Sequence, residues 1–465
     1  MNGGKGQRYI LFFRWMEGES EMNREVFKSI LLIILVLASV SMTLNIWFYR
    51  TNYEEGPSGS FKQVAIAESK SIRDVIRPTL ALKHSGSETF GQTDSTLVTK
   101  TYRLFQNAHF TDVFPLYEKN NLPKRSGSVS YEILFPAPLT LDTLQKVFQF
   151  NQNDLSFPRK IQVDRVEVYP STSAGGRLIA IFRSKDGRAE FYAVANNLKI
   201  DHLNQTLTSG EPIPYSKQKL SEKSVYLPLE NTKIKGWLVY YENMQLESFI
   251  PVLFQDPKNV FVNRNKTTFS DGTSQLEKSG NILQFVNPEI SSGIAQAPED
   301  PIMRSYQYIN SFKGWTDDFI YDGINQAENS QRADVDFRIQ LGNYRVYNTE
   351  YYPNPYLSMI ELTWNNGELS NMNRTLLNFR PIGEQGLITL DSGETMLQKL
   401  REAGFSVRTI QDMAIGYRLN HPQEENSHSL RATPDWFFKM NNRWYSATDA
   451  TLPQHGKEKS GEAQP

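Results

Sequence analysis

An uncharged run of 21 residues near the amino terminus, from Ser29 to Tyr49, constrains this chain more than any other feature. As an α-helix it would span about 31 Å, which matches the hydrocarbon thickness of a bilayer. A cleaved secretory signal has a shorter apolar region and a small-residue cleavage site. This run instead ends in the aromatic residues WFY before Arg50, a pattern typical of a membrane interface. No polar stripe runs along it, which disfavours a buried core helix, and we predict a retained transmembrane helix over residues 29–49.

The charges that flank this segment predict its orientation. Only Arg50 follows it closely, before Glu54 and Glu55, whereas five cations precede it: Lys5, Arg8, Arg14, Arg24 and Lys28. The positive-inside rule therefore places residues 1–28 in the cytoplasm and the chain after Tyr49 outside the cell membrane. A chain that began at Met22 would read MNREVFKS, a usual short basic start. Our hypothesis is that residues 1–21 are an over-extended start.

The composition narrows the class of the exterior portion, residues 51–465. This portion is too long for one ordinary core and predicts two or three domains. The chain has no cysteine, so burial rather than disulfides must hold these domains. It carries 50 basic and 51 acidic residues, and the basic excess of a nucleic-acid-binding protein is missing.

Composition shifts along the chain predict the domain organisation. TNYEEGPSGS is polar and predicts a linker over residues 50–60, and SSGIAQAPEDP is a plausible boundary near Ser291. Between them we expect an N-terminal extracellular α+β domain over residues 61–195 and a middle domain over residues 196–299. A C-terminal α+β domain over residues 300–450 and a disordered tail over residues 451–465 complete the expected order.

Amphipathic helices followed by strands indicate the fold class. The segment DSGETMLQKLREAGF has capping-box spacing at Asp391 and Glu394 and a stop at Gly404. A second helix opens with Asp300 before Pro301, and a third starts from Thr140. Strands are expected over residues 406–419, 430–439 and 443–447, and a hairpin is expected to turn at residues 185–187. We predict α+β domains whose antiparallel sheets are each covered on one face.

The segment ADVDFRIQLGNYRVYN alternates strictly and therefore predicts a strand with two distinct faces. Val335, Phe337, Ile339 and Leu341 would face the core. The opposite face carries Asp334, Asp336, Arg338 and Gln340, and we interpret its charges as solvated.

The sequence nominates no catalytic, cofactor or metal site, and we predict that the chain is not an enzyme. The six histidines show no zinc spacing, and P-loop, dinucleotide-binding and serine-elbow motifs are missing. An S-x-x-K match at Ser216–Lys219 has no companion motifs and lies in what we interpret as a polar loop. Asp317 and Asp318 are neighbours, so in an extended segment they point to opposite faces.

Two aromatic segments, NTEYYPNPY and PDWFFKMNNRWY, remain as candidate surfaces. In the second, core and hairpin packing is favoured for Trp436, Phe438, Trp444 and Tyr445. Use of these aromatic residues to bind a protein stays open.

The apolar segment itself carries the best functional signal. On a helix, Ala38, Ser41 and Asn45 share one stripe, and Ser39 with Thr43 makes an adjacent pair of small residues. Small and hydroxyl residues let helices approach closely in a membrane, so these five are our candidate partner-contact residues. The alternative is that serine and threonine are simply tolerated here and that Asn45 sits near the interface.

The order of several segments resembles the YycH family: the start MNREVFKS, an uncleaved anchor ending in NIWFY, and a cysteine-free exterior with GWTDDF, DFRIQLGNYRVYN, IGYRLNHP and PDWFFKMNNRWY. The resemblance runs from about Met22 to about Ala450. It implies a non-enzymatic regulator of the cell-wall two-component system of low-GC Gram-positive bacteria. The implied partners are the WalK sensor histidine kinase and a YycI-type membrane protein, contacted largely through membrane helices, with no cofactor. A wall-processing enzyme or wall-binding module is the alternative, and an extracytoplasmic folding factor is a third hypothesis.

Overall fold

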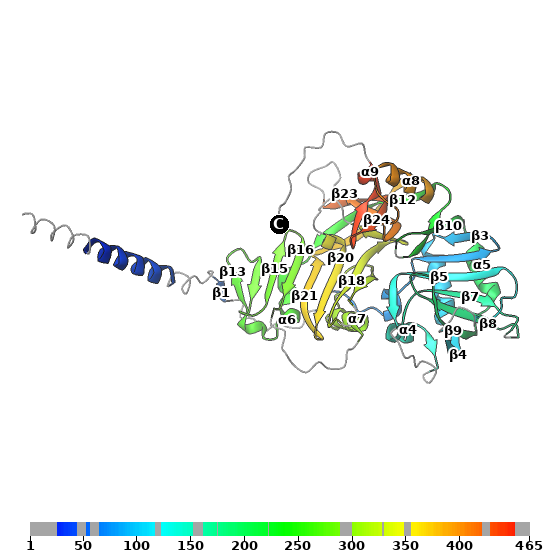
Figure 1. The fold of residues 1–465 in the computed structure, drawn as a ribbon, viewed down its shortest axis with the longest axis horizontal. Coiled ribbons are helices and arrows are strands. Elements are labelled where there is room, and N and C mark those ends of the chain that lie inside the picture. Colours follow the sequence, from blue (N-terminus) through cyan, green and yellow to red (C-terminus); the bar gives the residue numbers. More distant parts are fainter. Residues whose placement is uncertain are drawn as a thin grey trace, which may run out of the picture.

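Two large β-sheets with helices packed on them form the body of the protein (Figure 1). The computed structural model describes residues 26–43, 53–55, 65–116, 122–151, 161–173, 175–221, 223–288, 300–327, 330–347, 355–420 and 428–451. Residues 1–25 lie outside this range, as does the predicted tail over residues 451–465 except for Thr451, which ends a helix. The predicted α+β class is confirmed.

The first lobe is a sheet of 10 strands with helices beside it. Along the sheet the order is β11-β10-β3-β2-β5-β7-β8-β9-β4-β6. Its strands are β2 (Leu80–Ser85), β3 (Glu88–Gln92), β4 (His109–Pro115), β5 (Val129–Thr140), β6 (Gln149–Phe150), β7 (Gln162–Pro170), β8 (Leu178–Arg183), β9 (Ala189–Asn196), β10 (Ile213–Lys219) and β11 (Ser224–Pro228). The helices before and between them are α2 (Ile72–Val75), α3 (Ser95–Gln106), α4 (Leu141–Val147) and α5 (Ile200–Thr208).

The second lobe is a sheet of 15 strands in the order β1-β13-β14-β15-β16-β21-β20-β18-β19-β23-β24-β12-β22, with β17 on β18 and β25 on β24. Its strands are β1 (Tyr53–Glu55), β12 (Thr232–Asn243), β13 (Phe261–Asn263), β14 (Thr268–Ser270), β15 (Gln275–Ser279), β16 (Ile282–Val286), β17 (Phe319–Asn325), β18 (Arg332–Leu341), β19 (Tyr344–Tyr347), β20 (Met359–Asn365), β21 (Glu368–Thr375), β22 (Leu377–Leu390), β23 (Asp412–Asn420), β24 (Ser429–Met440) and β25 (Arg443–Ser446). Its helical segments are η2 (Leu246–Phe249), α6 (Ile250–Leu253), η3 (Pro257–Asn259), α7 (Pro301–Ser311), η4 (Pro355–Ser358), α8 (Gly393–Glu402) and α9 (Ala447–Thr451). The domain boundaries predicted at residues 195 and 299 stay predictions, because strand pairing alone does not define folding units.

Helix starts follow the capping chemistry of the sequence. The Asp300 side chain accepts from the Ile302 amide at the start of α7, and Thr140 caps α4 in the same way. For α8 the predicted cap was wrong by one residue. Ser392, not Asp391, accepts from the Thr395 amide, and Gly404 follows the helix with φ +94°.

Three local predictions for strands are also corrected by the structure. The segment 406–411 is a turn, and β23 begins only at Asp412. The S-x-x-K match lies on strand β10, not in a loop, and residues three apart on a strand point to opposite faces. Arg338 and Gln340 of β18 are 5% and 4% exposed, whereas Asp334 and Asp336 are half-buried, so the solvated interpretation is wrong for the second half of that face.

The second half of the polar face of β18 is buried because both faces of the sheet are covered there. The same holds for the first lobe. On β7, Val166 and Val168 join the main apolar core, while Arg165 and Glu167 of the other face are also buried. The expectation of one covered face for each sheet is therefore wrong for the central strands. In the C-terminal segment, Trp436 and Phe438 are fully buried, so the predicted core packing there is confirmed.

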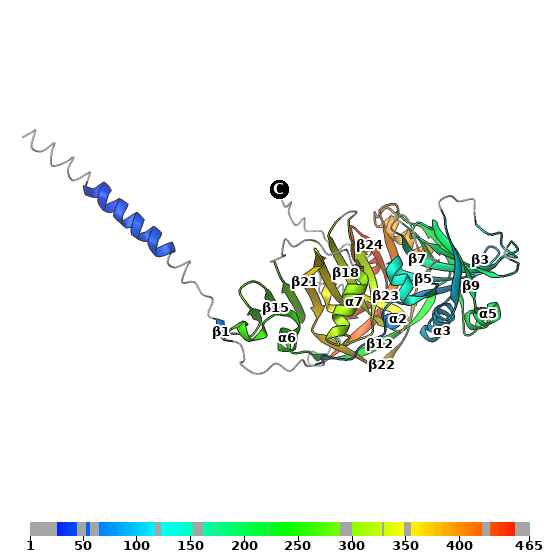
Figure 2. The ribbon, with the colours of Figure 1, turned by 90° about the horizontal axis from the view of Figure 1, so that it is seen from below.

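The two lobes are joined by direct contacts, and they lie side by side in both ribbon views (Figures 1 and 2). Tyr321 donates to the Pro138 carbonyl at 2.8 Å, and Asn343 donates to the Thr79 carbonyl at 2.8 Å. The Ser221 amide donates to the Ile410 carbonyl at 3.0 Å. One apolar core cluster contains residues of both sheets, which makes the body a single packed unit.

Candidate functional site

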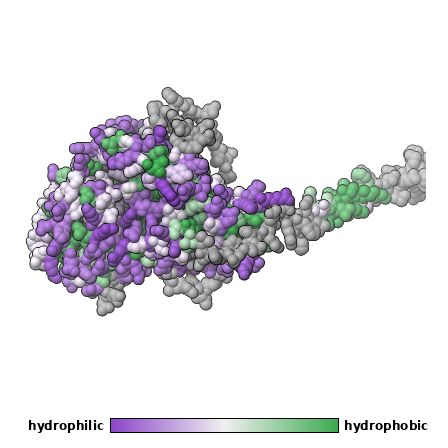
Figure 3. Space-filling model, turned by 180° about the vertical axis from the view of Figure 1, so that it is seen from behind, coloured by the Kyte–Doolittle hydropathy of each residue, from purple (hydrophilic) through white to green (hydrophobic). Residues whose placement is uncertain are grey.

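The helix Val26–Thr43 carries most of the candidate site residues predicted from the sequence. Its 18 residues have a mean hydropathy of 2.3, and none of this span is buried. At 1.5 Å per residue it is about 27 Å long. Figure 3 shows it as an apolar rod beside a body whose visible face is largely hydrophilic. In the part of the chain that the structure describes, it is the one helix long and apolar enough to cross a membrane.

Four of the five candidate partner-contact residues lie on this helix. Ala38, Ser39, Ser41 and Thr43 are all exposed, and Asn45 falls outside the described residues, as does the rest of the predicted span to residue 49. The Thr43 hydroxyl donates to the Ser39 carbonyl at 2.8 Å. The Thr43 donor is therefore satisfied within its own helix, as a hydroxyl in a bilayer requires. Contact of this stripe with a partner stays a prediction.

The chain that follows the helix is fixed to the second lobe at two places. The first is β1, which pairs antiparallel with β13 in the register Tyr53↔Asn263, Glu54↔Val262 and Glu55↔Phe261. Residues 53–55, within the predicted linker, thereby form the outer strand of the large sheet (Figure 1).

The second place is the segment Ile66–Lys70, which lies against residues 306–318; we call this contact the 66–70 clamp. The Ala67 amide donates to the Lys313 carbonyl at 2.7 Å. The Lys70 amide donates to Asn310 Oδ1 at 2.9 Å, and its Nζ donates to the Asp317 carbonyl at 2.7 Å. Tyr306 in turn donates to the Lys70 carbonyl at 2.7 Å.

Two buried charged residues, Asp317 and Arg374, support the segment on which residues 66–70 lie. Asp317 Oδ1 accepts from the Phe379 amide at 2.7 Å, and burial raises the pKa of Asp317 to about 7. Arg374 is fully buried and donates to the Gly314 carbonyl at 3.1 Å; burial lowers its pKa to about 10. Asp318, by contrast, is 48% exposed and pairs with Lys70 and Arg77. One acid is buried and the other is exposed, which is consistent with the prediction that the two point to opposite faces. The sequence did not predict that both would lie beside residues 66–77.

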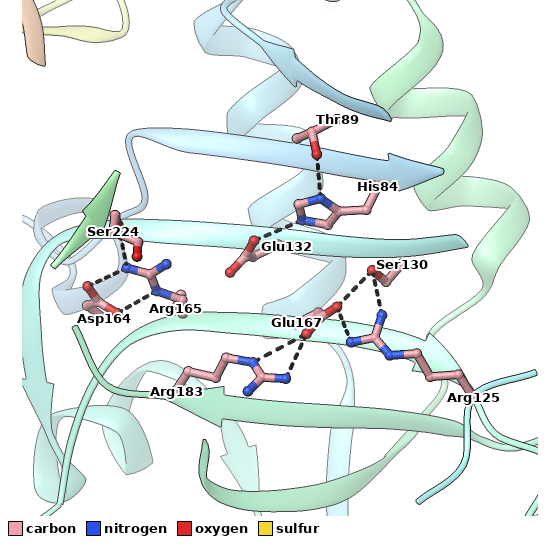
Figure 4. Close-up of polar contacts among 10 residues, drawn as sticks. All are labelled: His84, Thr89, Arg125, Ser130, Glu132, Asp164, Arg165, Glu167, Arg183 and Ser224. Atoms are coloured by element: carbon pink, nitrogen blue, oxygen red, sulfur yellow. Dashed lines mark hydrogen bonds and ion pairs between the residues drawn. The ribbon is translucent and has the colours of Figure 1, made fainter. Parts of the chain in front are cut away.

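A polar network covers the face of the first sheet that lies opposite Val166 (Figure 4). Glu167 accepts from Arg125 at 2.6 Å, from Ser130 at 2.8 Å and from Arg183 at 3.1 Å. Burial acts to raise the pKa of Glu167, but the two guanidinium groups outweigh it and hold that pKa below its ordinary value. The acceptors of Glu167 are therefore used within the sheet.

His84 bridges two further strands in the same view (Figure 4). Its ring nitrogens lie 2.9 Å from Thr89 Oγ1 and 2.9 Å from Glu132 Oε2. This order superficially matches a nucleophile, base and acid, but His84 and Thr89 are directly paired in one antiparallel ladder. We interpret the three residues as a cross-strand tie. Within the described ranges, no group of three or more His, Asp or Glu side chains is arranged to hold a metal ion.

Comparison with known proteins gives consistent matches over almost the whole chain. The family model described as the YycH protein N-terminal domain matches residues 25–211, and the model described as the YycH protein C-terminal domain matches residues 222–452. The "two-component system WalR/WalK regulatory protein YycH" of Bacillus subtilis strain 168 is 20% identical over 463 residues, which cover 94% of this chain and 99% of the relative.

One solved structure shares the fold of this chain. The crystal structure of YycH from Bacillus subtilis matches with a TM-score of 0.66 at 16% identity, covering 83% of this chain and 99% of that one. An uncharacterised protein from Eubacterium rectale ATCC 33656 matches with a TM-score of only 0.34 at 6% identity, covering 52% of this chain and 90% of that one.

The two family models leave few residues between Glu25 and Leu452 unmatched. The relative of matching length is named as a regulatory protein of a two-component system. The chain is therefore a regulatory protein and belongs to the YycH family.

Proposed function

We propose that this chain regulates the sensor histidine kinase of a WalR/WalK-type two-component system from within the cell membrane, and that it acts with a YycI-type partner to tune cell-wall signalling. The observation that carries the proposal is the match of both family models and of a WalR/WalK regulatory protein over 94% of the chain. The absence of a catalytic motif in the sequence is consistent with action by contact.

The proposed topology follows from the flanking charges. Lys28 and the basic residues before it would stay in the cytoplasm, and the lobes would lie outside the cell. The helix Val26–Thr43 supplies an apolar length suited to a single crossing.

In the proposed mechanism, the stripe of small residues packs against a kinase helix better in one signalling state than in the other. A difference of about 1.4 kcal/mol between the two states changes their ratio tenfold. The β1–β13 pairing and the 66–70 clamp attach the chain beyond the helix to the second lobe. A movement of that lobe would therefore be passed to the helix, and a helix movement to the lobe.

An exchange of the apolar span tests the contact directly. Residues 29–49 are replaced by an unrelated apolar span of equal length, and transcription from a promoter controlled by the response regulator is measured. We expect regulation to be lost while the body remains folded, because the described contacts that hold the lobes do not involve this helix. Normal regulation by the exchanged chain would refute the helix-contact mechanism.

A finer variant tests the stripe itself. Ala38→Leu with Ser41→Leu adds bulk where close approach is proposed, and co-purification with the kinase should fall several-fold. The matched control is Val26→Leu with Ile33→Phe, which adds bulk on the side of the helix away from both the stripe and the pair Ser39 and Thr43, and it should leave co-purification unchanged.

A further inference from the structure

The short strand β1 ties one end of the large sheet to the point where the chain leaves the membrane. Arg50 is the first charged residue after the uncharged run, so it marks the end of the segment that can lie in hydrocarbon. Tyr53, the first residue of β1, is three residues further on, and three residues of extended chain reach about 11 Å at most. Strand β13 is hydrogen-bonded to β1 and therefore lies only about 5 Å from it. When the helix crosses a bilayer, this edge of the sheet lies in or next to the headgroup layer.

The register of the β1–β13 pairing determines which end of these strands is nearer to the membrane. Tyr53 is paired with Asn263, and Glu55 is paired with Phe261. The chain therefore enters the sheet beside the last residue of β13, where residues 264–267 join β13 to β14; we call this connection the entry turn. In both ribbon views, β1 and β13 lie at the end of the body nearest the apolar helix (Figures 1 and 2).

Cations gather at the entry turn. Residues 264–267 and residues 278–281, at the end of β15, contain three cations and no acid: Arg264, Lys266 and Lys278. The two segments are in contact, since the Lys278 amide donates to the Thr267 carbonyl at 2.8 Å. Arg264 and Lys266 are exposed, and within the described ranges neither side chain has a hydrogen bond or an ion pair. Their charges are therefore available to a partner.

The acids of the same strands lie behind the entry turn. Glu54 and Glu55 are the second and third residues of β1, further along the sheet than its entry point. Glu277 precedes Lys278 on β15 and accepts from a glutamine of the same strand at 3.1 Å. Asp271 lies in the turn after β14, at the opposite end of the strands. The end that receives the chain from the membrane is therefore the positive end, in a chain whose net charge is −1.

Asn263 fixes the shape of the entry turn. Its Oδ1 accepts from the Thr267 amide at 2.8 Å and from the Thr268 amide at 3.2 Å. Its carbonyl accepts from the Lys266 amide at 3.0 Å. The backbone that carries Arg264 and Lys266 is therefore ordered before it meets a partner, which lowers the entropic cost of binding.

We propose that the entry turn binds anionic phospholipid headgroups and docks this end of the second lobe on the membrane surface, through Arg264, Lys266 and Lys278. Each Lys or Arg held near an anionic bilayer strengthens binding about fivefold. The covalent connection through Arg50 keeps the turn near the headgroups, so a modest attraction is sufficient. This inference rests on the membrane crossing in the proposed function, but not on the kinase or on the orientation of the helix.

The position of the entry turn can be measured with a single label, because the chain has no cysteine of its own. A fluorophore is attached to Asn265→Cys in the entry turn or to Gln205→Cys, an exposed position on α5 at the other end of the body (Figure 1). The full-length chain is reconstituted in vesicles of phosphatidylcholine and phosphatidylglycerol at 7:3, or of phosphatidylcholine alone, with a quencher on a fraction of the headgroups. We expect strong quenching at position 265 only in the anionic vesicles, and none at position 205 in either.

Charge variants separate lipid binding from simple proximity. Arg264→Gln with Lys266→Gln, in the chain labelled at position 265, should lower the ratio of quenched to unquenched label about 25-fold in the anionic vesicles. The matched control is Lys233→Gln with Lys258→Gln, which removes the same charge from two exposed lysines outside the entry turn and should leave the ratio unchanged. An unchanged melting temperature in both variants shows that the body is intact.

Flotation of the chain with the vesicles, measured on the same samples, reports the membrane crossing separately. A chain that floats but shows no quenching at position 265 would overturn the proposal. Equal quenching in neutral vesicles, or in the Arg264→Gln, Lys266→Gln variant, would also overturn it, because the connection to the helix would then account for the proximity alone. A chain that does not float would refute the membrane crossing of the proposed function and this inference with it.

Discussion

Among single residues, two buried aspartates of the second lobe differ because their neighbours differ. Asp322 lies 2.6 Å from both Arg338 and Arg345. Asp336 has an oxygen, Oδ1, that is buried without a hydrogen-bond partner in the described structure. The two aspartates therefore predict opposite dependences of the folding stability on pH.

Replacing Asp322 by Asn should destabilise the protein by about 3–5 kcal/mol, because Arg338 and Arg345 would be left buried without their counter-charge. Burial acts to raise the pKa of Asp322, but the two arginines hold it well below its ordinary value. The stabilisation is therefore present above about pH 4, the ordinary range of an aspartate, and is lost as pH falls below it. Urea unfolding between pH 7 and pH 3 measures this. Glu384→Gln, at an exposed ion pair with Lys235, is the control and should cost under about 1 kcal/mol.

Replacing Asp336 by Asn should change the pH dependence of stability in the opposite sense to the Asp322 variant. Burial, then Glu361 and Asp322, raise the pKa of Asp336 to about 8, against the opposing influence of Arg338 and Lys439. Because the folded state keeps this proton longer than the unfolded state, its contribution is full below about pH 4 and is lost as pH rises towards 8. The variant should remove a slope of about 1.4 kcal/mol per pH unit from the free energy of unfolding in that window. An unchanged slope would show that Asp336 does not titrate there.

Among the elements, the 66–70 clamp holds the chain that leads from the apolar helix, and the proposed mechanism depends on it. Asn310, on α7, is central to it, since its Oδ1 accepts from the Lys70 amide and from the Trp315 indole at 3.1 Å. Helix α7 begins where the sequence predicts, directly after Asp300.

Asn310→Ala should cost about 1–3 kcal/mol, because two donors lose their acceptor. Hydrogen exchange should quicken at the amides of Ala67 and Lys70 and stay unchanged in the strands of the first lobe. Asn259→Ala is a matched control, since this exposed side chain binds only Asp256 among the described residues. Equal exchange in the two variants would contradict the role given to Asn310.

For the whole molecule, close contact between the lobes decides whether they move as one body. Gly393, the first residue of α8, faces Leu227 of β11, and a Cβ added at Gly393 would lie 2.3 Å from the Leu227 Cβ. A glycine is therefore required at this lobe boundary by the approach of its neighbour rather than by its own backbone.

Gly393→Ala should cost about 1–3 kcal/mol through overpacking, although alanine is the better helix former. The free energy of unfolding and the rate of limited proteolysis between the lobes measure the effect. Gly383→Ala is the control, because nothing lies within 4 Å of a Cβ there, and it should be close to neutral. A neutral Gly393→Ala would mean that the lobes can separate at this point without cost.

The sequence by itself determined much, though not all, of the local structure of this protein. The run from Ser29 to Thr43 is uncharged whatever surrounds it, so its helix and its apolar character could be predicted. The starts of α4 and α7 depend on a side chain and an amide two or three residues apart, and they were predicted correctly. The alternation in β18 placed Val335 and Phe337 in the core for the same reason.

Only the tertiary structure decided what covers the other face of β18, where Arg338 meets Asp322 of β17. It also decided that residues 66–70 rest on the 306–318 segment, and that Glu167 meets both Arg125 and Arg183. Periodicity fixes which side of a strand a residue takes, but not which distant segment arrives there. Those pairings depend on the packing of the whole chain, which no short stretch of sequence encodes.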